Sequence, residues 1–103
     1  MLDSFKTQLK DAITSVCNPT LVILFGSHAY GEPNSDSDID LLIVDDTGLT
    51  KRELRQKIRE ALRFLKYPKD ILISNSKDYT FYSKEPGSVF REACEKGITL
   101  WSR

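Results

Sequence analysis

Cysteine and long apolar runs are scarce in this sequence, and both shortages exclude classes of protein. Two cysteines, Cys17 and Cys94, are too few for a disulfide framework and too far apart for a CxxC metal or redox site, so we expect both to be small core residues. The longest apolar run, residues 21–25, is far shorter than the ~18 residues of a membrane-spanning helix, and the N-terminus lacks a basic segment followed by an apolar one. We therefore expect a soluble cytoplasmic protein without a membrane partner.

Net charge is also absent, because 15 basic residues balance 15 acidic residues. A protein that binds nucleic acid through its bulk charge carries a basic excess, so we expect no direct nucleic-acid binding. The length matches one domain, residues 1–103, because domains cluster near ~100–150 residues. Such a chain leaves little room for a second domain that would hold an acceptor molecule.

The charges are nevertheless unevenly distributed along the chain. No Lys or Arg stands between Asp11 and Lys51, and we expect the acids Asp36, Asp45 and Asp46 of this stretch to be solvated loop residues. Residues 51–69 carry eight basic side chains against two acidic ones. This basic stretch is either a solvated helix face or a surface that docks an acidic partner.

Helical and strand patterns alternate along the chain. An apolar periodicity of three to four residues predicts helices, short apolar runs predict buried strands, and Thr50 with Glu53 forms a capping box at the start of one helix. The expected helices are residues 4–17, a segment from 51 that ends before Pro68, a turn within 76–82, and 89–95 with Gly97 as its end signal; the expected strands are 21–25, 39–44, 70–74 and an edge strand at 98–101. This alternation predicts an α/β sandwich.

Two carboxylates and a Gly-Ser pair form the constellation that indicates chemistry. Asp38 and Asp40 begin the second strand, where their side chains share one face with Cα atoms about 7 Å apart. Paired hard oxygen ligands suit Mg²⁺, although DxD spacing alone also fits an exposed loop boundary. Gly26-Ser27 follows the first strand directly, where a glycine allows close backbone approach and helix-start N–H groups can bind an anion. Together the two pairs predict a phosphate and metal site.

From Gly26-Ser27 through ten residues to Asp38 and Asp40, the sequence resembles the GSx10DxD signature of the DNA polymerase β-like nucleotidyltransferase superfamily. Its small size is similar to that of the minimal nucleotidyltransferases (MNT). The resemblance implies an α/β (α+β) fold with a small mixed sheet flanked by helices. It also implies that Gly26 and Ser27 bind nucleotide phosphates, and that Asp38, Asp40 and a third acid, Asp70, are catalytic metal ligands.

The resemblance further implies a cofactor, a substrate and a partner. The cofactor would be Mg²⁺ or Mn²⁺, and the nucleotide substrate would be ATP. MNT proteins are commonly paired with HEPN-type ribonuclease toxins, and some neutralise the toxin by transferring AMP to one of its tyrosines. We therefore expect an antitoxin enzyme that AMPylates a HEPN partner. Two alternatives stay open, namely a non-catalytic antitoxin that acts by binding alone and nucleotidyl transfer to a small molecule.

Several side chains near the motif have open roles. Many relatives carry a basic residue after Gly-Ser, whereas here His28 is the sole candidate, and it either contacts phosphate or lies on the loop. Tyr30 either stacks on the nucleotide or packs. The aromatic group Tyr79, Phe81 and Tyr82 either covers an adenine ring or, as is commoner near a chain end, belongs to the core.

Overall fold

Helices and strands alternate as the sequence predicts. The structure, a computed structural model, describes residues 2–31 and 37–103. Its elements in chain order are α1 (Leu2–Val16), β1 (Leu21–Phe25), α2 (Ser27–Tyr30), β2 (Ile39–Val44), α3 (Lys51–Ala61), β3 (Lys69–Ser74), α4 (Ser76–Tyr82), α5 (Val89–Lys96) and β4 (Ile98–Ser102). No helix in these two ranges has the length and apolar character needed to cross a bilayer.

The strands form a mixed sheet in the order β3-β2-β1-β4. β1 pairs antiparallel with both β2 and β4, whereas β2 and β3 pair in parallel through the crossover helix α3. The mixed sheet and the edge position of β4 confirm the predicted fold class. β3 forms the opposite edge of the sheet.

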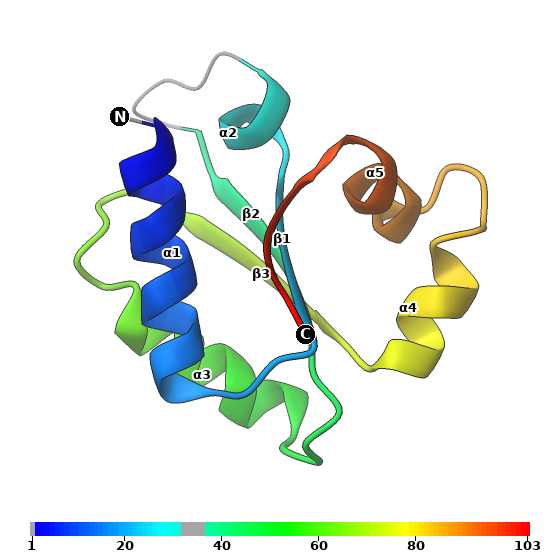
Figure 1. Cartoon of the computed structure of the whole chain (residues 1–103), viewed down its shortest axis with the longest axis horizontal. Helices are drawn as coiled ribbons and strands as arrows, with labels where there is room; N and C mark the ends of the chain where they lie inside the picture. The colour runs from blue at the N-terminus through cyan, green and yellow to red at the C-terminus, as the bar shows by residue number, and fades with distance from the viewer. Residues whose placement is uncertain (1, 32–36) are drawn as a thin grey trace.

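Two helical layers cover the sheet (Figure 1). α1 and α3 lie on one side of it, and α4 and α5 lie on the other. Side chains alternate between the layers along each strand, so Val22 and Leu24 join the core under α1 and α3, while Ile23 and Phe25 pack towards α5. This double cover explains why β1, and β2 after Asp40, are continuously apolar.

Side-chain caps fix the starts of α3, α4 and α5. The Thr50 side chain accepts a hydrogen bond from the backbone N–H of Glu53 at 3.1 Å, which confirms Thr50 as the cap and thus one half of the predicted capping box. The helix stops at Ala61, before Pro68 as predicted. After it, the N–H of Leu65 donates to the Leu62 carbonyl at 3.0 Å, a tighter turn that redirects the chain towards Pro68.

Two predictions about buried residues were wrong. Cys94 is exposed, because α5 turns its neighbour Ala93 into the core instead. Cys17 is half-buried, and burial raises the pKa of its thiol to about 11. Asp45 is not a solvated acid, since only 7% of it is exposed and its Oδ1 accepts a 2.8 Å hydrogen bond from the N–H of Thr47. That bond closes a turn at the end of β2, which the sequence does not reveal.

Candidate active site

The predicted site residues meet at one edge of the sheet. Because β1 runs antiparallel to β2 and β2 runs parallel to β3, the end of β1 lies beside the starts of β2 and β3. In this register Phe25 is opposite Asp40, and Asp40 is opposite Asp70. Gly26-Ser27 therefore emerges from β1 next to Asp40, Asp70 lies one strand further along the sheet, and Asp38 precedes β2 by one residue.

The side chains of all three aspartates point to the same face of the sheet. Asp38 and Asp40 alternate in step with Leu42, and Asp70 alternates in step with Leu72; both leucines belong to the core cluster under α5. This alternation of side chains places the acids on the α4 and α5 side of the sheet. Asp38 and Asp70 are exposed there, whereas Asp40 is half-buried.

Gly26 makes a contact that no other residue type could make. Its backbone angles, φ 77° and ψ −160°, lie in a region that is essentially restricted to glycine. A Cβ added at Gly26 would lie 2.0 Å from Oδ2 of Asp40, so the carboxylate occupies the space that a side chain would fill. The Gly-Ser turn and the first strand acid are thus packed directly against each other.

The short helix α2 starts at this contact. Gly26 is its N-terminal cap, and the N–H of Ala29 donates to the Gly26 carbonyl at 3.0 Å. The first N–H groups of a helix have no partner within the helix, so Ser27 begins a segment suited to an anionic group. A phosphate bound here would lie next to the aspartates.

Negative charge is concentrated around Asp40. Burial raises the pKa of the Asp40 carboxyl above its usual range, and the charges of Asp70 and Asp38 raise this pKa further. Glu92 of α5 adds to the same effect, whereas His28 opposes it. The acids therefore repel one another when no cation screens them, and a cation bound between them would relieve that repulsion.

The donor set fits a divalent cation that shares its ligands with a substrate. Among residues 2–31 and 37–103, no three His, Cys, Asp or Glu side chains stand close enough together to form a complete metal site. Mg²⁺ commonly takes only one or two protein carboxylates and completes its shell with water and substrate phosphates. The close pair of Asp40 and the Gly26 turn, flanked by Asp38 and Asp70, provides such a partial shell.

His28 has a role that the sequence did not predict. Only 8% of the residue is exposed, and its ring packs against Phe5 at 5.7 Å and Tyr67 at 4.8 Å between centroids. Its Nε2 lies 3.1 Å from the backbone oxygen of Ser37, and a carbonyl can only accept, so Nε2 carries the hydrogen. His28 thereby joins the Gly-Ser turn to the residue before Asp38. Of the two roles left open for His28, the loop position is excluded because the residue lies within α2 and is buried, and contact with phosphate stays a prediction.

The aromatic group on α4 is more exposed than predicted. Phe81 is 60% exposed and Tyr82 is also exposed, so the core assignment was wrong for both. Tyr79 is half-buried against Phe90, and burial raises the pKa of its hydroxyl. The remaining sequence predictions, on the Tyr30 side chain and on Asp36, fall outside the described residues.

Comparison with known proteins identifies the relatives of the chain. The profile of a family described as "Nucleotidyltransferase domain" matches residues 2–98. A Methanocaldococcus jannaschii protein, named as a protein adenylyltransferase, is 41% identical over 70 residues, which make up 65% of this chain and 69% of the relative.

Two solved structures share the fold. A toxin-antitoxin structure with AMP-PNP has a TM-score of 0.64 and 21% identity, and the match covers 95% of this chain and 73% of that chain. A double aspartate-to-glutamate mutant of the toxin-antitoxin MntA-HpeT has a TM-score of 0.53 and 19% identity, with coverage of 100% and 74%.

Proposed function

The chain belongs to the nucleotidyltransferase domain family and is a nucleotidyltransferase, and from this premise we propose that it transfers AMP from ATP to a tyrosine of a HEPN-type ribonuclease toxin. In this proposal it acts as the antitoxin of the pair. Asp38, Asp40 and Asp70 hold the divalent metal, and Gly26 and Ser27 receive the triphosphate.

The observation that carries the proposal is the register of the three strands. It aligns Asp40 with Asp70 and places the Gly26 turn against the Asp40 carboxylate. Carboxylates beside an anion-binding backbone turn suit a substrate that is both phosphorylated and metal-bound. A structural role alone would not favour acids that repel one another at the edge of a sheet.

The residues of the chain divide the reaction between them. The Gly26-Ser27 turn positions the triphosphate, and Asp70 orients the acceptor hydroxyl and takes its proton. The acceptor oxygen forms a bond to the α-phosphorus while the bond from this phosphorus to the β-phosphate oxygen breaks, and pyrophosphate leaves. Divalent metal held by Asp38 and Asp40 would supply charge stabilisation for the attacking and departing oxygens.

The relatives support the choice of nucleotide and acceptor. One relative is named as a protein adenylyltransferase, which supports AMP as the transferred group and a protein as the acceptor. Both structural neighbours are toxin-antitoxin proteins, and one contains AMP-PNP. In the mutant neighbour the two exchanged aspartates are two residues apart, which is also the spacing of Asp38 and Asp40.

A labelling experiment tests the proposal. The protein is incubated with Mg²⁺ and the protein encoded beside it, using ATP labelled at either the α- or the γ-phosphate. We expect label from the α-phosphate, and none from the γ-phosphate, on a tyrosine of the partner. Label from the γ-phosphate would indicate phosphorylation instead, and a neutralised partner without label would establish inhibition by binding alone.

A further inference from the structure

Arginine is concentrated on one surface of the molecule, which we call the arginine stripe. It consists of Arg52, Arg55, Arg59 and Arg63, four of the six arginines in the chain. Their spacing of three or four residues keeps them on one side of α3 and the turn that follows it. Together with Gln56 and Glu60 they line a shallow hollow of about 380 Å³.

The stripe differs from the rest of the same helix. Leu54 and Ile58 face the core, and an adjacent exposed face carries the mixed charges of Glu53 and Lys57, the usual pattern of a solvated helix. In contrast, basic residues three or four positions apart repel one another and oppose helix formation. Helix stability therefore does not explain the stripe.

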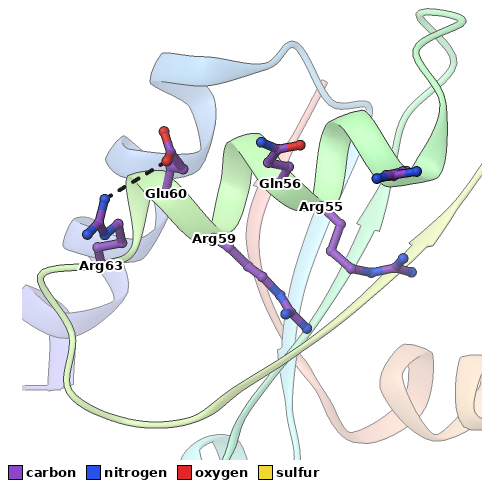
Figure 2. A pocket seen from close by; sticks show the side chains of 6 residues that line it. Arg55, Gln56, Arg59, Glu60 and Arg63 are labelled. Atoms are coloured by element: carbon purple, nitrogen blue, oxygen red, sulfur yellow. Dashed lines mark ion pairs between the residues drawn. The ribbon is translucent and has the colours of Figure 1, made fainter.

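Few acids within the chain neutralise the stripe. In the part of the chain that the structure describes, neither Arg52 nor Arg59 forms an ion pair. Arg63 lies 3.9 Å from Glu60, and both side chains are exposed (Figure 2). The guanidinium groups of Arg52 and Arg59 are therefore available to groups from outside the chain.

The stripe adjoins the candidate active site. Nε of Arg55 donates a 3.2 Å hydrogen bond to the backbone oxygen of Ile71, the residue after Asp70, on the edge strand β3. Figure 2 shows Arg55 and Arg59 extending to the same side of α3, towards this strand. A partner lying on the stripe would therefore run along the edge strand that carries Asp70, and it would reach the acids by passing around this edge to the α4 and α5 side of the sheet.

The chemistry of arginine narrows the class of partner. Its planar fork binds carboxylates and phosphates with paired hydrogen bonds, which lysine cannot do. A nucleic-acid surface usually belongs to a strongly basic domain, whereas this chain has no net charge and a pI of about 6.6, and Glu60 lines the hollow. These observations favour carboxylates of a polypeptide over a phosphate backbone.

We propose that the arginine stripe docks an acidic segment of the acceptor polypeptide beside the active site. The identity of the occupant as the acceptor rests on the proposed function, but binding of an acidic segment is measured without ATP. The two claims can therefore fail separately.

Peptide binding tests the proposal directly. The probes are a fluorescent peptide with one tyrosine and a glutamate at every third or fourth position, the same peptide with glutamine in place of glutamate, and an oligoribonucleotide of equal charge. We expect the glutamate peptide to bind more tightly than the other two probes and to weaken as salt increases. Failure of the glutamate peptide to bind, or tighter binding of the RNA, would overturn the proposal.

Matched variants separate the stripe from general charge. Arg52→Gln with Arg59→Gln and the control Lys57→Gln with Lys66→Gln each remove two exposed positive charges. We expect the arginine pair to weaken peptide binding roughly three- to thirtyfold, in line with two exposed charge contacts, and the lysine pair to have little effect. Equal losses in both variants, or none in either, would reject the stripe as a docking site.

A third comparison links docking to transfer. With ATP and Mg²⁺ present, the arginine variant should raise the KM for the glutamate peptide and leave kcat nearly unchanged, because the stripe does not touch the reacting atoms. Peptide binding together with no label from the α-phosphate on the partner protein would reject the proposed function and retain the docking site. AMP transfer that is indifferent to the arginine variant would retain the function and reject the docking site.

Discussion

Replacing Gly26 by alanine probes the central contact of the site with a magnitude that can be estimated. The backbone angles at Gly26 would cost an alanine about 1–3 kcal/mol. The new Cβ would also lie 2.0 Å from Oδ2 of Asp40, and moving that side chain off its preferred rotamer costs about 0.5–1.5 kcal/mol more. We expect a total loss of about 1.5–4.5 kcal/mol, or roughly 7–21 °C in Tm at about 4.6 °C per kcal/mol for a chain of this length.

Two other glycines separate backbone strain from the clash. Gly48 and Gly87 also have positive φ angles, 92° and 80°, but an added Cβ would meet nothing within 4 Å at either position. Alanine there should cost about 1–2 kcal/mol each, from backbone strain alone. Chemical denaturation of all three variants, measured with and without Asp40→Ala, gives the coupling between Gly26 and Asp40.

The expected coupling is favourable, since removing the carboxylate makes room for the new methyl group. The Gly26→Ala, Asp40→Ala double variant should recover about 0.5–1.5 kcal/mol relative to the sum of the single changes. The Gly48 and Gly87 variants should show no coupling with Asp40→Ala. If Gly26→Ala behaved like these controls and showed no coupling, the packing of Asp40 against the glycine turn would be refuted.

Three further predictions address single residues. Asp70→Asn should leave the melting temperature nearly unchanged and lower the transfer rate by about 10²–10⁴-fold, the range for loss of a general base; an undiminished rate would assign the third acid elsewhere. His28→Phe keeps the ring packing but loses the hydrogen-bond donor to Ser37. We therefore expect the free energy of unfolding to fall by about 0.5–1.5 kcal/mol and AMP transfer to become slower. His28→Gln should partly rescue the transfer rate, and the control Tyr67→Phe should not change it. Hydrogen bonds from Ser76 hold the pKa of Asp46 below its usual range. The stabilisation from Asp46 is therefore present above the pKa of the unfolded state and disappears as pH falls through the lower pKa of the folded state. The difference in unfolding free energy between wild type and Asp46→Asn, measured by denaturation across pH, should close below about pH 4, and a difference that stays constant would contradict this assignment.

Much of the fold follows from local sequence signals. Residues 21–25, and residues 39–44 apart from Asp40, are apolar because helices cover both faces of the sheet, and the observed strands have these bounds. The Thr50 and Glu53 box fixed the start of α3 for a similar local reason. These features depend on neighbours in sequence, so a pattern of residues is enough to predict them.

The features that escaped prediction depend on long-range packing. His28 is buried by Phe5 and Tyr67, which lie far from it in the sequence. Glu92 influences Asp40 only because α5 packs over the end of β1. The family resemblance predicted Asp70 as the third acid, but its position opposite Asp40 was not predicted, since strand register is a property of the assembled sheet.

The most direct test of the account measures the partner after the protein has been removed. The toxin is coexpressed with either the wild-type chain or the Asp38→Ala, Asp40→Ala variant, separated from it, and then analysed by intact mass and ribonuclease activity. We predict that toxin from the wild-type coexpression is heavier by whole AMP units and stays inactive, whereas toxin from the variant coexpression is unmodified and active. An unmodified toxin that both forms of the protein inhibit equally, and only while bound, would contradict nucleotidyl transfer as the function.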